Sequence, residues 1–246
     1  MGIGYARDKT TIGTDASDSR AEGVSLALYG SFQPTPSTFV DALIGYGELR
    51  HRSDRYVPAF GDFARMHRRS EQFFGSIAGG YELQSGSALL SPYARLDFVY
   101  DRFRQGTESG AGLNALTYFE QSQTGVLGAL GLRAESRHET SFGYARPRLR
   151  AELRHDFDDR RNANVAYADL TGGPVFTVPV PGARRDALLL GAGSDFELHN
   201  GLTLGVDYTT QRSSGPDREQ TLRVWLRKEL DGKPLPAGLP AAKLFE

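Results

Sequence analysis

Residues 90–101 read Leu-Ser-Pro-Tyr-Ala-Arg-Leu-Asp-Phe-Val-Tyr-Asp, and their alternation decides the fold class. The even positions carry apolar side chains as far as Tyr100, whereas Arg95, Asp97 and Asp101 share the opposite face. A period of two is typical of a β-strand that has one apolar and one polar face. We therefore expect a strand here rather than a helix.

The same alternation recurs along most of the chain. Further runs lie at 24–32, 40–47, 72–83, 126–135, 145–154, 188–198, 202–209 and 222–230, and a segment around Ile3 and Tyr5 adds a tenth candidate strand. Many runs reach about 10 residues, near the length that a tilted strand needs to cross a bilayer. Their apolar faces carry Tyr or Phe toward the ends, where interfacial aromatic girdles are expected. These features favour membrane strands over the shorter strands of a soluble sandwich.

The connections between the runs alternate between long and short. The long ones are 8–22, 49–69, 105–117 and 156–185; the short ones are 33–37, 84–87, 136–140 and 197–202, and 211–218 is intermediate. Outer-membrane barrels have short periplasmic turns and longer external loops. The phase therefore predicts an all-β, antiparallel, up-and-down transmembrane β-barrel with an even number of strands and both chain ends in the periplasm.

Composition excludes several functional classes. The 29 Lys and Arg residues balance 30 Asp and Glu residues, so we expect no nucleic-acid partner. The chain has no cysteine, which excludes disulfides, thiolate metal sites and cysteine nucleophiles. Mean hydropathy is −0.42, and no apolar run approaches the ~18 residues of a membrane helix. The first eight residues lack the basic and apolar regions of a signal peptide, so we expect none to be encoded here.

No motif of enzyme chemistry is present in the sequence. It contains no nucleophile elbow, no phosphate-binding loop, no dinucleotide fingerprint and no zinc-protease motif. His51 and His67 flank one predicted external loop and could approach each other, but solvated side chains explain them as well. The other histidines are His138, His155 and His199. We expect no enzyme activity, no catalytic residue, no metal and no cofactor.

The polar faces of the runs predict a charged lumen. The residues expected to line it are Asp41, Arg95, Asp97, Asp101, Arg133, Glu135, Arg146, Arg148, Arg150, Glu152, Arg154, Asp195, Glu197, Asp207, Arg223 and Arg227. Since each buried charge needs a partner, one interpretation is a pairing network that fills the lumen. The other is a charged wall that grips a passing polypeptide, and the two are compatible. The arginine row 146–154 is either an anion-selective stripe or a set of partners for acids on neighbouring strands.

Several stretches resemble the C-terminal translocator domain of the autotransporters, the type V secretion proteins of Gram-negative bacteria. They are 23–32, 41–47, 90–96, 146–157, 187–193 and 202–208. The resemblance covers about 2–230 and implies a twelve-stranded outer-membrane barrel that anchors a larger protein and supports export of an N-terminal passenger. If 219–230 is the twelfth strand, residues 2–7 lie in the third. We therefore expect a fragment that lacks the first hairpin, a lumen helix and the passenger.

The resemblance also implies partners. They are outer-membrane lipid and lipopolysaccharide, the barrel-assembly machinery, and the passenger of the same polypeptide. The arginine-rich stretch 65–69 could touch lipopolysaccharide phosphates, which suit the forked donors of Arg, although an ordinary solvated loop is the simpler interpretation. The loop 156–185 is expected to project outside and to help fold or cap the emerging passenger. Some autotransporter barrels cut their own linker with luminal acids, a role that we carry onto no residue here.

The C-terminus departs from the family pattern. Family members usually end the last strand on an aromatic residue, whereas Leu230 stands at that position. We expect a barrel over 1–230 and a disordered, proline-rich tail over 231–246. Three alternatives stay open: a stand-alone porin-like or adhesin-like barrel, a non-functional barrel fragment, and a soluble ligand-binding barrel with its apolar faces turned inward.

Overall fold

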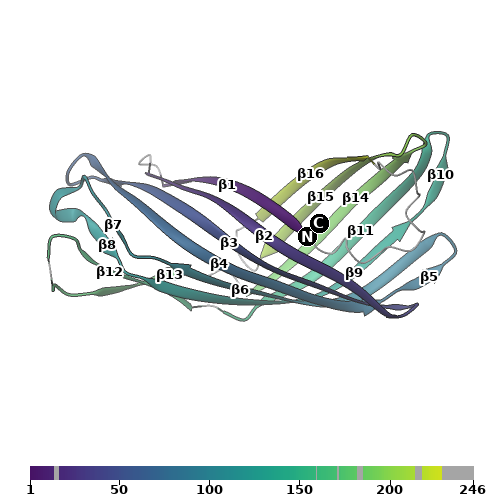
Figure 1. The fold of residues 1–246 in the computed structure, drawn as a ribbon, viewed down its shortest axis with the longest axis horizontal. Coiled ribbons are helices and arrows are strands. Elements are labelled where there is room, and N and C mark those ends of the chain that lie inside the picture. The colour runs from purple at the N-terminus through teal and green to yellow at the C-terminus, as the bar shows by residue number, and fades with distance from the viewer. Residues whose placement is uncertain (14–16, 159, 171, 182–184, 214–217, 229–246) are drawn as a thin grey trace.

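One long antiparallel sheet dominates the computed structural model, which describes residues 1–246 apart from 14–16, 159, 171, 182–184, 214–217 and 229–246. Its main path runs through β1 (Gly2–Ile12), β2 (Ser17–Thr35), β3 (Thr38–Val57), β4 (Asp62–Tyr81), β6 (Ala88–Phe103), β9 (Gln121–Ser136), β11 (Gly143–Asp156), β14 (Asp186–Leu198), β15 (Leu202–Ser213) and β16 (Arg218–Lys228). Each strand pairs with the next one on this path. Figure 1 shows the sheet curled into a half-barrel. The prediction of an all-β, antiparallel, up-and-down fold is confirmed.

Short turns join the strands at one end of the sheet. Two small strands lie there: β5 (Leu83–Ser85) pairs with β6, and β10 (His138–Thr140) pairs with β11. Gly86 and Gly201 occupy these turns with φ of 60° and 76°. Because a Cβ is strained in this left-handed region, glycine permits the tight reversals here.

A second sheet lies at the other end of the molecule, in the segments that the sequence marked as loops (Figure 1). Its order is β13 (Phe176–Pro181), β12 (Arg160–Tyr167), β8 (Leu116–Tyr118) and β7 (Gly106–Thr107), and a 3-10 turn η1 covers Gly112–Asn114. The expectation of long loops at 105–117 and 156–185 was therefore wrong in its detail. These strands are short, and the pairing of β12 with β8 joins distant segments, so their own sequences carry little periodic signal.

The connection expected at 49–69 is also mostly strand. β3 and β4 remain paired as far as Val57 and Asp62, so only 58–61 form the turn. The alternation fades beyond Tyr46 because Glu48, Arg50 and Arg52 are polar on the outer face as well. Both faces are polar there, and the binary pattern disappears although the hydrogen-bond ladder continues.

The two faces of the main sheet differ in chemistry. Outward side chains are large, apolar and exposed, as shown by Leu96 at 53%, Leu130 at 66% and Leu153 at 64% exposure. The opposite, concave face buries polar residues and a small cluster of Phe39, Ala78 and Tyr93. An apolar surface of this extent fits contact with lipid rather than water. It contradicts the alternative of a soluble barrel with inward apolar faces.

The main sheet is open. β1 and β16 end its path, and among the described residues no pairing joins them. The same part of the chain contains no helix long and apolar enough to cross a membrane.

Candidate functional site

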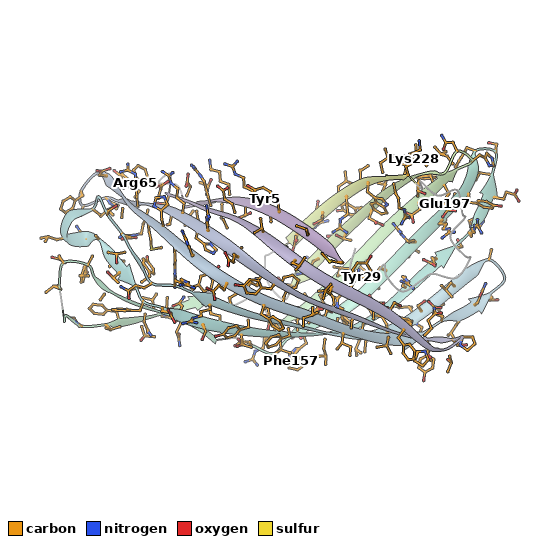
Figure 2. All side chains as sticks on the ribbon, in the orientation of Figure 1. Tyr5, Tyr29, Arg65, Phe157, Glu197 and Lys228 are labelled. Atoms are coloured by element: carbon orange, nitrogen blue, oxygen red, sulfur yellow. The ribbon has the colours of Figure 1, made fainter. Side chains whose placement is uncertain are left out.

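The residues predicted to line the lumen lie on strands of the main sheet, on the face opposite the exposed leucines. They are Asp41 on β3; Arg95, Asp97 and Asp101 on β6; Arg133 and Glu135 on β9; Arg146, Arg148, Arg150, Glu152 and Arg154 on β11; Asp195 and Glu197 on β14; Asp207 on β15; and Arg223 and Arg227 on β16. Figure 2 shows side chains on both faces of the curved sheet, with Glu197 near the short-turn end.

Glu152 is the centre of this wall, and its side chain is buried. Arg150 donates to Oε1 at 2.6 Å, and Arg154 donates to Oε2 from Nε at 2.9 Å. Arg95 reaches the same carboxylate at 3.4 Å, and the Tyr93 hydroxyl donates to Oε1 at 2.7 Å. Three guanidinium groups from β6 and β11 thus converge on one carboxylate. A charge with this many partners can remain ionised although it is buried.

Gly131 makes room for this arrangement. It lies on β9 directly opposite both Tyr93 on β6 and Glu152 on β11. A Cβ at residue 131 would stand 2.4 Å from the Tyr93 ring, so only glycine lets the ring lie across β9. The phenol therefore spans one strand to reach the carboxylate on the next.

Arg148 forms a second centre on the same wall. Its guanidinium donates to Asp195 at 2.9 Å and to Asp207 at 2.8 Å, on β14 and β15. The group also stands 5.1 Å from the ring centroid of Trp225 on β16, a cation–π contact. Gly205 leaves room for the Trp225 ring, because a Cβ at residue 205 would clash with the indole.

The four arginines of β11 each have a carboxylate partner. Arg146 lies 3.0 Å from Glu197, and the other three are the partners of Glu152, Asp195 and Asp207 described above. Arg146 and Arg148 thus pair with acids on neighbouring strands, whereas Arg150 and Arg154 pair with Glu152 on their own strand. The row is better described as a set of ion-pair partners than as an anion-selective stripe.

Among the described residues, the remaining predicted ones form fewer hydrogen bonds and ion pairs than Glu152 and Arg148. Asp101 accepts a hydrogen bond of 2.9 Å from Gln72, and Arg133 lies 3.7 Å from Glu82. Asp41 is 1% exposed and lies directly opposite Ser31 on β2. Asp97 accepts from Ser76 and lies 3.1 Å from Arg95, while the Nε of Arg227 lacks a partner within the described part of the chain.

The two centres border one cavity of about 490 Å³ on the concave face. Its lining includes Glu135, Arg223 and the facing threonines Thr209 and Thr221. Its charged groups are mostly paired, and its threonines offer hydroxyl groups. The wall can therefore hold water and contact a polypeptide without offering a large apolar surface.

Several wall residues were absent from the predicted set. Tyr93, Gln72 and Glu82 contact predicted charges, Gln211 accepts from Arg154 at 2.6 Å, and Trp225 stacks on Arg148. Alternation placed Trp225 and, by parity, Tyr93 on the polar face. Neither side chain is charged, so the pattern of charges alone did not mark the Tyr93 hydroxyl or the Trp225 ring as part of the wall.

The histidines form no common site in the structure. His51 faces inward and shares a hydrogen bond of 2.8 Å with Ser70, whereas His67 is exposed on the outer face. Across the described ranges, no group of three or more potential ligands could hold a metal ion.

A separate cluster lies between the main sheet and the second sheet. Arg55 donates to both oxygens of the buried Glu108, at 2.9 and 2.6 Å, and this bond raises the pKa of the guanidinium. Glu108 also accepts from the backbone N–H of Leu116 at 2.9 Å. Val57 and Ala111 belong to the small apolar core beside it. These contacts fix the second sheet to the ends of β3 and β4.

Comparison with known proteins gives a consistent result. The model of the autotransporter β-domain family matches residues 1–209. Two extracellular serine proteases of Serratia marcescens are similar in sequence. One is 29% identical over 231 residues, covering 87% of this chain and 20% of the protease; the other is 31% identical over 156 residues, covering 61% and 14%. The chain thus spans about a fifth or less of the length of these curated relatives.

Solved structures are similar in fold. The translocator domain of the autotransporter NalP from Neisseria meningitidis superposes with a TM-score of 0.74 at 16% identity, covering 91% of this chain and 72% of that one. The β-domain of the Bordetella autotransporter BrkA gives a TM-score of 0.65 at 17% identity, covering 92% and 80%.

Proposed function

The chain belongs to the autotransporter β-domain family, and from this premise we propose how its two faces serve the export of a passenger. The family's domains are outer-membrane translocators of Gram-negative bacteria that export an attached passenger domain. The chain is such a translocator, and its location is the outer membrane.

The convex face holds the domain in the bilayer. Its exposed leucines form an apolar band. Toward the second sheet this band ends at an aromatic row of Tyr46, Phe73 and Tyr100, which lie directly opposite one another on β3, β4 and β6. Aromatic rings at such a boundary suit the interface between hydrocarbon and headgroups. We place the second sheet on the external side, because long connections of these barrels lie outside.

The concave face provides the path for the passenger. The observation that carries this proposal is the pairing of its charges around Glu152 and Arg148. A wall of paired ions and hydroxyl groups stays hydrated, and it has no large apolar surface that would bind an unfolded chain. An unpaired charge of one sign would instead retain segments of the opposite sign.

Two matched substitutions in the full-length protein test this path. Thr209→Leu with Thr221→Leu puts an apolar pair on the wall, while Thr210→Leu with Gln220→Leu puts the same pair on the adjacent outward position. Exposure of the passenger is measured by protease added to intact cells, and heat-modifiable migration reports barrel assembly. We expect slower exposure for the inward pair alone. Equal export by both variants, with both barrels assembled, would contradict the proposal.

We propose no catalytic step for this chain. The serine-protease name belongs to relatives of which the chain matches about a fifth, and the family's function is translocation. If the matched fifth of such a relative showed protease activity when purified without the rest of the protein, this assignment would be contradicted.

The second sheet receives the emerging passenger in this proposal. It lies at the external mouth and is fixed there by Arg55 and Glu108. Deletion of 160–183 removes β12 and β13 completely, so we expect reduced or misfolded passenger on the cell surface. Unchanged surface display would rule out this role.

We propose that further strands of the same polypeptide complete the barrel. A bilayer tolerates no open sheet edge, and β1 and β16 are edges in the described structure. The proposed partners beyond the passenger are lipopolysaccharide and the barrel-assembly machinery, which inserts the strands. Leu230 stands where family members usually have an aromatic residue, and the tail 231–246 was expected to be disordered. Both lie outside the described residues.

A further inference from the structure

The outer face of β1–β4 carries rows of basic side chains next to the apolar band. One row across the four strands consists of Lys9, Arg20, Arg52 and His67. The neighbouring row, one step closer to the band, consists of Arg7, Glu22, Arg50 and Arg69. Arg104 adjoins Arg69 through a backbone hydrogen bond of 2.9 Å. We call the basic members of these rows, with Arg104, the basic patch.

The register fixes the face and the height of the patch. Residues directly opposite in a sheet share a face, and Arg50 has the parity of Ile44 and Tyr46, which are exposed. Successive rows are two residues apart, or roughly 7 Å along the strand. The patch therefore begins about two rows beyond Tyr46, where the headgroups of a bilayer would lie. Arg65, further along β4, lies near the end that carries the second sheet (Figure 2).

Like charges meet within the patch. Lys9 faces Arg20, Arg20 faces Arg52, and Arg50 faces Arg69. Like charges directly opposite on neighbouring strands are destabilising unless a counter-charge joins them.

The described residues supply only part of that counter-charge. Arg20 pairs with Asp18 at 2.9 Å, Arg52 lies 3.5 Å from Asp54, and Arg104 pairs with Glu71. Among the described residues, no carboxylate lies within ion-pair distance of the remaining Arg and Lys members, which are Arg7, Lys9, Arg50 and Arg69. These four side chains are exposed, so an external anion can reach them.

We propose that the basic patch binds the phosphate groups of lipopolysaccharide in the outer leaflet. This inference rests on the proposed function, because that function places the second sheet, and hence the patch, on the external side. Guanidinium forks match phosphate oxygens, and several cations just beyond an apolar band suit the headgroup of a lipid whose acyl chains contact the leucines. The lipid phosphates would separate the opposed cations and fix β1–β4 at one depth.

Binding of lipid A to the full-length protein in detergent tests the proposal. The probes are bisphosphorylated lipid A, dephosphorylated lipid A with the same acyl chains, and phosphatidylglycerol. We expect Arg50→Gln with Arg69→Gln to weaken binding of the bisphosphorylated form by about tenfold or more, since two headgroup contacts are lost. The control Arg137→Gln with Lys228→Gln removes the same charge near the short-turn end and should leave the affinity within about twofold.

Several outcomes would overturn the inference. They are equal binding of the phosphorylated and dephosphorylated lipids, equal binding of phosphatidylglycerol, and an unchanged affinity in the patch variant. Heat-modifiable migration checks that each variant is folded. Passenger exposure on cells is measured in parallel, so a failure of lipid binding with intact export would reject the patch and leave the translocator function standing.

Discussion

Glu152 shows how a single residue can hold a membrane barrel together from the inside. Its carboxylate joins guanidinium groups that would otherwise repel one another at close range. Removing one partner of a buried ionic cluster is costly because the remaining charges stay desolvated.

We expect Glu152→Gln to lower the free energy of unfolding by about 3 kcal/mol or more. Urea unfolding in micelles measures this, and Glu135→Gln, on the same wall without an ion pair among the described residues, should cost under about 1 kcal/mol. Equal costs would contradict the central role of Glu152.

Gly131 is the second residue whose identity the wall dictates. An alanine there would displace the Tyr93 ring and lengthen its hydrogen bond to Glu152. We expect Gly131→Ala to destabilise the protein by about 1–3 kcal/mol. Gly30→Ala on β2 is the control, because no atom lies within 4 Å of its Cβ, and it should cause no loss. If neither substitution lowers the free energy of unfolding in urea, glycine is not required at residue 131 for the Tyr93 ring to lie across β9.

The extended hairpin of β3 and β4 is the element in which pH matters. His51 lies on its inner face beyond the apolar band, near Ser70, Phe103, Arg68 and Asp101. Burial first, and then the charge of Arg68, lower the pKa of this histidine in the folded state, although Asp101 opposes the shift.

The consequence for stability has a defined sign. Above about pH 6.5, an ordinary histidine is neutral in both states, so His51 imposes no penalty. As the pH falls below that value, the unfolded chain binds the proton first, and stability decreases until the folded pKa is reached. We expect His51→Asn to flatten this dependence between pH 7.5 and 5 in urea unfolding. His199→Gln, in a turn at the other end, is the control, and an unchanged slope in His51→Asn would refute the assignment.

The extent of the elements marks where sequence reasoning succeeds and where it stops. Alternation identified strands wherever one face meets lipid, as around Leu96 and Leu153, because only there do the faces differ in polarity. Beyond Tyr46 both faces are polar, and the continuation of β3 to Val57 left no binary pattern. The sequence also placed Glu152 on the concave face. Alternation put Arg150 and Arg154 beside it on the same strand, but Arg95 could not be predicted as a partner, since it lies 57 residues away and only the register across β9 brings the two together.

At the scale of the whole molecule, the main sheet is open among the described residues, and its two edge strands must be paired within the membrane. Phasing of long and short connections predicted the up-and-down order, because that order depends only on which turns are tight. How the barrel closes is a property of the complete assembly. If further strands lie between β1 and β16, those two edges stand several strand spacings of about 4.8 Å apart.

These 246 residues contain no cysteine, so closure can be measured with introduced cysteines in the full-length protein once any cysteine outside this chain has been replaced. A Tyr5→Cys variant on β1 is combined in turn with Leu222→Cys, Val224→Cys and Leu226→Cys on β16, and oxidative cross-linking is followed on gels. We expect none of these pairs to form a disulfide, because the bond requires Cα atoms within about 7 Å. The pair Val206→Cys with Val224→Cys lies directly opposite across β15 and β16 and should cross-link rapidly. Rapid cross-linking of β1 to β16 would instead show direct closure, and it would mean that the strands described here suffice to seal the barrel against lipid.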